Sequence, residues 1–179
     1  MKLNLACGKN KLPGWFNVDI SPLVAPDEVR DLLHFPWPYS DVEAIFCSHF
    51  IEHIGDEFIS FMDECHRVLR PGGLLHIRSP YYTSIRCWQD PTHKRAITEA
   101  TFTYFRKADR INMGVEHYPI KSDFDIGEIR LHYHQDVPQE DAENLRMHAW
   151  NVVADIEVLL KKHDPDEQSV DRQAHALVQ

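Results

Sequence analysis

The distance along the chain between its first two apolar runs limits the possible folds more than any other feature. Residues 3–7 (LNLAC) have the short apolar pattern of a buried strand, and Gly8 follows them directly. A second strand-like run occupies residues 15–20 (WFNVDI), after the turn sequence LPG. Asp19, in this second run, comes eleven residues after Gly8. We therefore expect two strands joined by a tight turn, with almost no room for a helix between them.

Three further extended segments are predicted before residue 81. Residues 29–38 (VRDLLHFPWP) begin with a short extended piece, after which Pro36 and Pro38 exclude a long helix. Residues 42–50 (VEAIFCSHF) and 74–80 (LLHIRSP) are apolar runs of strand length.

The clearest predicted helix spans residues 56–70. Its apolar residues recur at steps of three and four, with charged residues between them. Two acidic residues occupy the predicted first turn and two arginines lie near its end, as the helix dipole favours. The sequence PGG at 71–73 is expected to end the helix.

These elements predict an α/β fold, because apolar strands joined by a helical crossover form a parallel sheet with helices on its faces. In the second half, the pattern indicates a helix over 98–108, with Phe102 and Phe105 facing inward. Residues 128–134 (EIRLHYH) alternate like an antiparallel strand. Residues 139–163 have the apolar face typical of a C-terminal helix.

The length suits a single domain over residues 1–179, and neither an internal repeat nor a linker interrupts it. Residues 1–80 are expected to form a cofactor-binding half. The more polar residues 81–138 are expected to form a substrate or lid region.

Charge and cysteine content narrow the class of protein. The formal net charge of −9 disfavours nucleic acid as a partner, since such proteins usually present a basic surface. No apolar run approaches the ~20 residues of a membrane span. Four cysteines without a C-x-x-C pair, and a start that leads directly into a strand-like run, predict a cytoplasmic protein without a signal peptide.

The strand ends carry the residues that could bind a ligand, because ligands of open α/β sheets bind beyond the carboxyl ends of the strands. Gly8 permits a sharp turn and a close approach to the backbone. The Asp19 carboxylate could accept two hydrogen bonds from a ribose diol. Asp31 could accept one from an adenine amine, with Leu32 and Leu33 covering the ring.

The lack of further glycines indicates which nucleotide fits. A pyrophosphate needs several free backbone N–H groups at a helix N-terminus, and here Gly8 is the one glycine of the turn directly after the first strand, with scarcely a helix behind it. A nucleoside without phosphate, such as S-adenosylmethionine, suits it better. A nicotinamide-dependent oxidoreductase is correspondingly disfavoured.

Five segments together carry a family resemblance: LNLACG, DIS, RDLLHFPWP, EAIFCSHFIEHI and ECHRVLRPGGLLHIRSP. The chain resembles the class I S-adenosylmethionine-dependent methyltransferases over about residues 3–95. It is most similar to the compact branch of the type 11 methyltransferases, in which P-G-W-x-N-V-D follows the glycine turn almost at once. The resemblance implies a three-layer Rossmann-like fold with a mostly parallel sheet, a C-terminal antiparallel strand and a reduced first crossover helix. Many members have a G-x-G turn, and here Ala6 replaces its first glycine.

The resemblance also implies which residues form the site. Cofactor contacts are expected from the strand ends, namely Ala6, Cys7, Gly8, Asp19, Ile20, Asp31, Leu32, Ser48 and His49. A D-P-T-H-x-R segment lies over the site in the family, and here it follows the predicted strand 74–80. The expected substrate-binding residues are Glu52, Tyr81, Tyr82, Asp90 and Arg95.

His53 and His93 are the candidates for a general base, since the free pKa of histidine lies near neutrality. A hydroxyl acceptor would use such a base, whereas an amine acceptor needs none. Each of these residues could instead belong to an ordinary turn or helix start.

No metal site is predicted. His132 and His134 alternate on a predicted strand and therefore share a face, with His117 or His93 as possible companions. Spacing fixes no third ligand, so a polar face is the simpler interpretation.

The sequence thus predicts methyl transfer from S-adenosylmethionine to an acceptor, most simply a small molecule or a saccharide. The alternative is a non-catalytic protein that binds S-adenosylmethionine or S-adenosylhomocysteine, or a subunit that depends on a partner. The sequence does not decide the oligomeric state.

Overall fold

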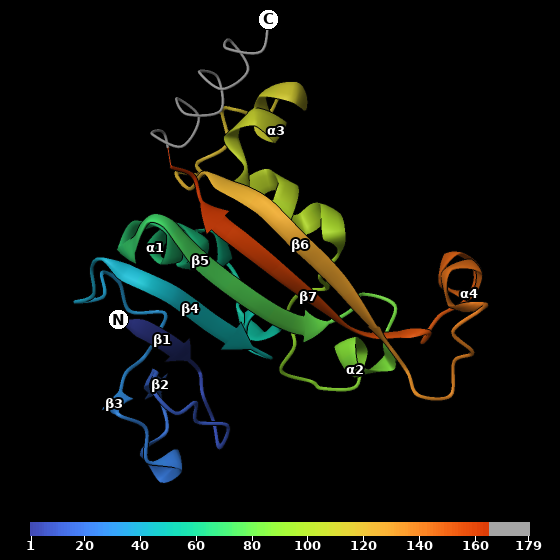
Figure 1. The fold of residues 1–179 in the computed structure, drawn as a ribbon, viewed down its shortest axis with the longest axis horizontal. Helices are drawn as coiled ribbons and strands as arrows, with labels where there is room; N and C mark the ends of the chain where they lie inside the picture. Colours follow the sequence, from blue (N-terminus) through green and yellow to red (C-terminus); the bar gives the residue numbers. More distant parts are fainter. Residues whose placement is uncertain (165–179) are drawn as a thin grey trace, which may run out of the picture.

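The computed structural model describes residues 1–164, which form one seven-stranded sheet (Figure 1). In sheet order the strands are β3 (Glu28–Val29), β2 (Phe16–Asp19), β1 (Lys2–Leu5), β4 (Val42–Ser48), β5 (Leu69–Pro80), β7 (Val153–Lys162) and β6 (Phe124–Tyr133). The first five run parallel, and β7 pairs antiparallel with both β5 and β6. The predicted α/β class and mostly parallel sheet are confirmed.

The helices are short, apart from one. They are the 3-10 helices η1 (Pro22–Val24), η2 (Ile51–His53) and η3 (Glu99–Phe105), and the α-helices α1 (Phe58–Val68), α2 (Ile85–Trp88), α3 (Lys107–Asn112) and α4 (Ala142–His148). In the described chain no α-helix joins β1 to β2, β2 to β3 or β3 to β4. The reduced first crossover is therefore confirmed. No helix of residues 1–164 has the length and apolar character that crossing a membrane requires.

Helix α1 forms where the three- and four-residue steps predicted it. Phe61, Met62 and Cys65 are fully buried along one side of the helix. The expectation that PGG at 71–73 ends the helix is wrong: α1 ends at Val68, and PGG lies inside β5, which begins directly at Leu69. A Cβ on Gly73 would lie 2.8 Å from the Arg70 carbonyl oxygen, so only glycine lets the strand pass here.

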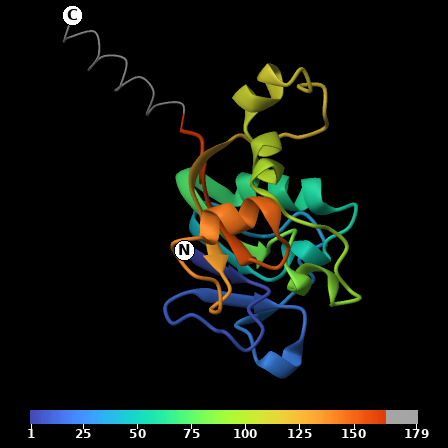
Figure 2. The same ribbon diagram turned by 90° about the vertical axis from the view of Figure 1, so that its right-hand side faces the viewer.

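One face of the sheet forms the hydrophobic core. Strand residues that point to this face are almost completely buried, among them Leu3, Leu5, Ile45, Cys47, Leu75, Ile77, Val158 and Leu160. Phe61 of α1 and Phe102 of η3 belong to the same core. Both helices lie behind the sheet in Figure 1 and to one side of it in Figure 2.

The opposite face of the sheet, turned toward the viewer in Figure 1, has no helix packed on it in the described residues. Because side chains alternate along a strand, the neighbours of the core residues point this way. They include Lys2, Phe46, Leu74, His76, Arg78, Arg130 and Glu157, none of which is buried. The third layer that the resemblance implies is therefore not formed by residues 1–164, because the connections among β1 to β4 contain no α-helix.

The predicted helix over 139–163 is wrong. Only α4 is helical there, and residues 153–162 form β7 between β5 and β6. Ile156, Val158 and Leu160 alternate into the core, while Asp155, Glu157 and Leu159 point to the other face. The spacing of the apolar residues in this run fits both the helical and the strand period. Pairing with two neighbouring strands stabilises the extended form.

The predicted helix over 98–108 is two short helices, η3 and α3, separated at Arg106, which has extended φ and ψ angles. Phe102 and Phe105 are buried as expected, at 0% and 2% exposure. The strand predicted at 128–134 is part of β6, which pairs antiparallel with β7.

Candidate functional site

Gly8 and Asp19 meet at the carboxyl edge of the sheet. The Gly8 N–H donates to Asp19 Oδ2 at 2.8 Å, and the Ser21 N–H donates to Oδ1 at 2.9 Å. The Asp19 side chain is held in place by these bonds and is 9% exposed. A carboxylate has about four acceptor positions, so two hydrogen bonds leave capacity for two ligand hydroxyls.

The backbone at this edge is strained. Ala6, Gly8 and His49 have φ angles of 51°, 50° and 53°, in the left-handed region. For a residue with a Cβ this conformation costs about 1–2 kcal/mol. Such strain concentrates at binding sites, where the surrounding structure holds it. It also explains why a glycine would suit the position of Ala6.

The other residues expected to contact the cofactor differ in exposure. Cys7 is buried, and burial together with the nearby Asp19 carboxylate raises the pKa of its thiol. The Ile20 side chain is 64% exposed. Ser48, the last residue of β4, is partly exposed, and the His49 N–H donates to the Arg78 carbonyl at 2.8 Å.

Asp31 forms a turn of its own after β3. Its Oδ1 accepts from the Leu33 N–H at 2.9 Å, and its Oδ2 lies 3.1 Å from His34 Nδ1. These bonds lower the pKa of Asp31, that from Leu33 most. Leu32 is 4% exposed and belongs to the hydrophobic core, which anchors this turn.

The segment around residues 90–95 packs against the segment that follows β4. The Lys94 N–H donates to the Glu52 carbonyl at 2.8 Å. Arg95 donates through Nε to the Ile54 carbonyl at 3.0 Å and through Nη2 to the Gly55 carbonyl at 2.6 Å. Burial lowers the pKa of Arg95. These contacts give Arg95 a structural function in joining the two segments.

The same packing brings the two predicted general bases together. The rings of His53 and His93 lie edge to face with their centroids 4.6 Å apart. Thr92 Oγ1 lies 2.9 Å from His53 Nδ1 and donates to Asp90 Oδ1 at 2.7 Å. Hydrogen bonds from Thr92 lower the pKa of Asp90. Glu52, 1% exposed, lies beside this pair.

The two adjacent tyrosines have different environments. Tyr81 is 2% exposed, and its hydroxyl donates to Glu99 Oε2 at 3.0 Å. Burial and the nearby Glu99 carboxylate raise the pKa of Tyr81 to about 12. Tyr82 is 37% exposed, so of the two it is the ring available to a ligand.

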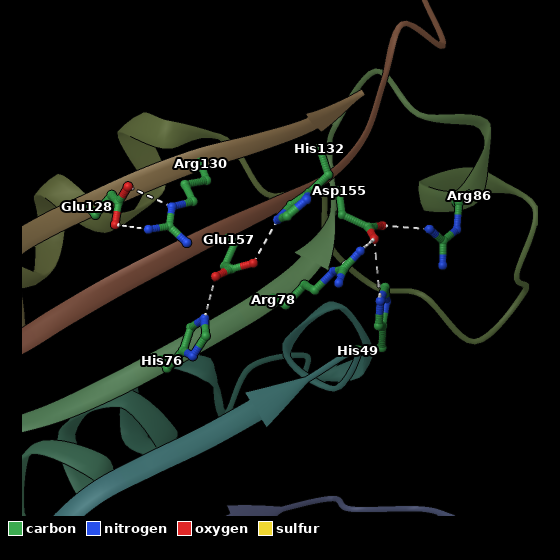
Figure 3. A network of polar contacts seen from close by, with 9 residues as sticks. All are labelled: His49, His76, Arg78, Arg86, Glu128, Arg130, His132, Asp155 and Glu157. Carbon is green, nitrogen blue, oxygen red and sulfur yellow. Dashed lines mark hydrogen bonds and ion pairs between the residues drawn. The ribbon is translucent and has the colours of Figure 1, made fainter. Parts of the chain in front are cut away.

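Asp155 is the site residue that the sequence did not reveal. Its carboxylate is 1% exposed and accepts from Arg78 Nη2 at 2.7 Å and from Arg86 Nη1 at 2.9 Å (Figure 3). His49 Nε2 lies 3.7 Å away. Asp155 thus links β7 to the ends of β4 and β5 and to α2. The predicted helix over 139–163 hid this position, and no motif marks it.

An open hollow of about 550 Å³ adjoins this network. Its lining comes from β5, α2, β6 and β7 and includes Arg78, Arg86, His132 and Asp155.

Comparisons with known proteins relate part of the sequence, and the fold, to methyltransferases. Residues 4–77 match the family described as "Methyltransferase domain". A probable S-adenosylmethionine-dependent methyltransferase from Mycolicibacterium smegmatis is 32% identical over 77 residues, which is 41% of this chain. The aligned part covers only 30% of that relative's length.

Solved structures share the fold. An S-adenosylmethionine-dependent methyltransferase from Archaeoglobus fulgidus matches with a TM-score of 0.62 and 17% identity, covering 90% of this chain and 85% of the other. The N-methyltransferase NodS from Bradyrhizobium japonicum, in complex with S-adenosylhomocysteine, has a TM-score of 0.57 and 14% identity, covering 90% and 76%. The family match over residues 4–77, the strand order and the shared fold make the chain similar to the class I S-adenosylmethionine-dependent methyltransferases. They support S-adenosylmethionine as its cofactor.

Proposed function

We propose that this chain transfers a methyl group from S-adenosylmethionine to an acceptor bound beside Glu52, His53 and the 90–95 segment. The observation that carries the proposal is the Asp19 carboxylate, held by the Gly8 and Ser21 N–H groups at the carboxyl edge of the sheet. A buried, oriented carboxylate with unused acceptor positions suits a ribose diol.

The remaining cofactor contacts follow from the strand ends. Asp31 would accept from the adenine amine, and the backbone from Ala6 to Gly8 and from Ser48 to His49 would line the rest of the cofactor. S-adenosylmethionine supplies a sulfonium methyl group that a nucleophile can attack in line. The chain's main contribution is then to position the two reactants, which can supply about 7–11 kcal/mol of the barrier.

The acceptor we propose is a small molecule or a saccharide. The net charge of −9 supports this over a polyanion such as nucleic acid. Tyr82 offers a half-exposed ring against which a sugar or an aromatic group could pack. For a hydroxyl acceptor, His53 or His93 would take the proton.

Calorimetric titration of S-adenosylmethionine and S-adenosylhomocysteine tests the cofactor site. Asp19→Ala removes the ribose acceptor, and we expect at least a tenfold loss of affinity, because hydrogen bonds to a charged group contribute about 1.5–3 kcal/mol each. Asp19→Asn keeps the size of the side chain and should also weaken binding. Glu43→Ala, an exposed carboxylate on β4 that pairs with Lys2, is the matched control and should bind normally. Folded wild-type protein that binds neither ligand would refute the proposal.

A second candidate is a binding protein or partner-dependent subunit without turnover of its own. The uncovered sheet face favours it, since a partner could supply the missing layer. Normal cofactor affinity together with no methyl transfer across an acceptor panel would support this candidate over the first.

A further inference from the structure

Glu52, His53 and His93 form a cluster of metal-ligand type near the carboxyl end of β4. One ligand atom from each residue lies within 4.8 Å of the other two. Glu52 and His53 belong to η2, while His93 comes from the loop after α2. The packing of residues 90–95 on residues 52–55 therefore creates the cluster from two distant parts of the sequence.

Hydrogen bonds set the tautomers of both histidines. His93 Nδ1 lies 2.8 Å from the Cys87 carbonyl oxygen, which can only accept, so Nδ1 carries the proton. Thr92 Oγ1 donates its hydrogen to Asp90, so it accepts from His53 Nδ1–H. This assignment follows from the hydrogen-bond network. In the neutral form both rings then have a lone pair on Nε2.

Glu52 adds a carboxylate oxygen without a hydrogen bond. The residue is 1% exposed, and Oε2 accepts from Ser79 Oγ at 3.1 Å. Oε1 is buried and has no hydrogen-bond partner in the described chain. The ring of His49 is nearby, with Nδ1 at 3.4 Å from Oε1. A buried carboxylate oxygen without a hydrogen bond is unfavourable, and a cation would satisfy it.

We propose that Glu52, His53 and His93 bind a divalent transition-metal ion such as Zn²⁺. Two imidazoles and one carboxylate suit Zn²⁺ or Fe²⁺ and would leave coordination positions open. The Cys87 carbonyl and the Thr92–Asp90 pair are the outer partners that orient metal-binding histidines in general. Both histidines are only partly buried, so an ion can reach them from solvent.

The proposal changes the chemistry expected at this position. A bound ion would occupy the Nε2 lone pairs of both histidines, which could then not serve as general bases. An acceptor hydroxyl on an open coordination position would instead lose its proton more easily, because the ion lowers its pKa. Only this consequence depends on the proposed methyl transfer.

Cobalt binding tests the site directly, without any need for activity. Tag-free protein is stripped of metal with a chelator and titrated with Co²⁺, and the visible d–d absorption is followed. A parallel Zn²⁺ titration by calorimetry measures affinity. We expect one equivalent to bind, and at least a tenfold loss of affinity in His93→Asn and in Glu52→Gln. His117→Asn, which changes an exposed histidine elsewhere, is the matched control and should bind as the wild type does.

Thr92→Val keeps the three proposed ligands and removes the hydroxyl that joins His53 to Asp90. We expect it to weaken binding by about 10–100-fold, as loss of an outer partner typically does. This variant also remains informative if a ligand variant fails to fold, as judged by circular dichroism. The proposal is overturned if folded wild type gives no cobalt spectrum, or if His93→Asn and Thr92→Val both bind like wild type. Loss of cobalt binding with S-adenosylmethionine binding intact would separate this site from the cofactor site.

Discussion

The two faces of the sheet are built from the same strands and have opposite characters. On β5, Leu75 is completely buried, whereas Leu74, the residue before it, is 38% exposed. The covered face packs on α1 and η3 and provides most of the core. The uncovered face carries ion pairs and histidines. The difference indicates that burial on one side is enough to hold this sheet together.

The polar groups of the uncovered face pair with one another, both across strands and along β6. Glu157 of β7 contacts His76 of β5 at 2.8 Å and His132 of β6 at 2.7 Å (Figure 3). Arg130 and Glu128 of β6 pair at 2.6 Å with more than half of each side chain exposed. Exposed pairs contribute little to stability, so we expect this face to matter mainly through its buried exception, Asp155.

Substitutions of the adjacent leucines Leu74 and Leu75 of β5 should show the largest difference in free energy of unfolding. Leu75→Ala should lower the free energy of unfolding by about 2–5 kcal/mol, because it leaves a cavity in the core. Leu74→Ala should lower it by less than about 1 kcal/mol. Urea denaturation of both variants measures the two values. Equal losses would mean that the second face is covered in solution, for example by another chain.

Asp155→Asn should cause the next largest loss in the free energy of unfolding. The substitution removes the charge that Arg78 and Arg86 share, while keeping the size of the side chain. We expect a loss of about 1–3 kcal/mol, as for a buried charge-assisted hydrogen bond. Thermal and urea unfolding give the value. The matched control, Glu128→Gln, breaks an exposed pair and should leave stability unchanged. A similar loss in both variants would show that the buried Asp155 matters no more than the exposed pairs of this face.

Glu157→Gln should cause the smallest loss of stability, and the size of this loss should depend on pH. Burial raises the pKa of Glu157, but hydrogen bonds with His132 and His76 outweigh burial and lower it below its ordinary value. A lowered pKa stabilises the fold above the unfolded-state pKa, and this contribution disappears as pH falls through the folded-state pKa. The wild type should therefore exceed the variant in urea midpoint near neutral pH and converge with it in acid, below about pH 4.3. A constant difference across this range would show that the carboxylate's charge is irrelevant.

Local pattern was enough to predict α1 and the first strands, because their periods are unambiguous, although the PGG sequence expected to end α1 lies inside β5. The proximity of Gly8 and Asp19 also followed, since neighbouring parallel strands end at the same edge. The pattern failed at β7, where the apolar spacing fits two periods and the pairing partners are remote in sequence. That error hid Asp155. The metal-type cluster escaped for a related reason, since His93 reaches Glu52 only through long-range packing.

The position of β7 in the sheet affects folding during synthesis as well as the stability of the folded chain. This strand lies between β5 and β6, yet it is the last of the seven to leave the ribosome. A nascent chain that has emerged only to residue 150 therefore has two strands with unpaired edges, and β6 has no other neighbour in the sheet. Unpaired edges are templates for aggregation. Synthesis of residues 153–162 closes both edges in a single step.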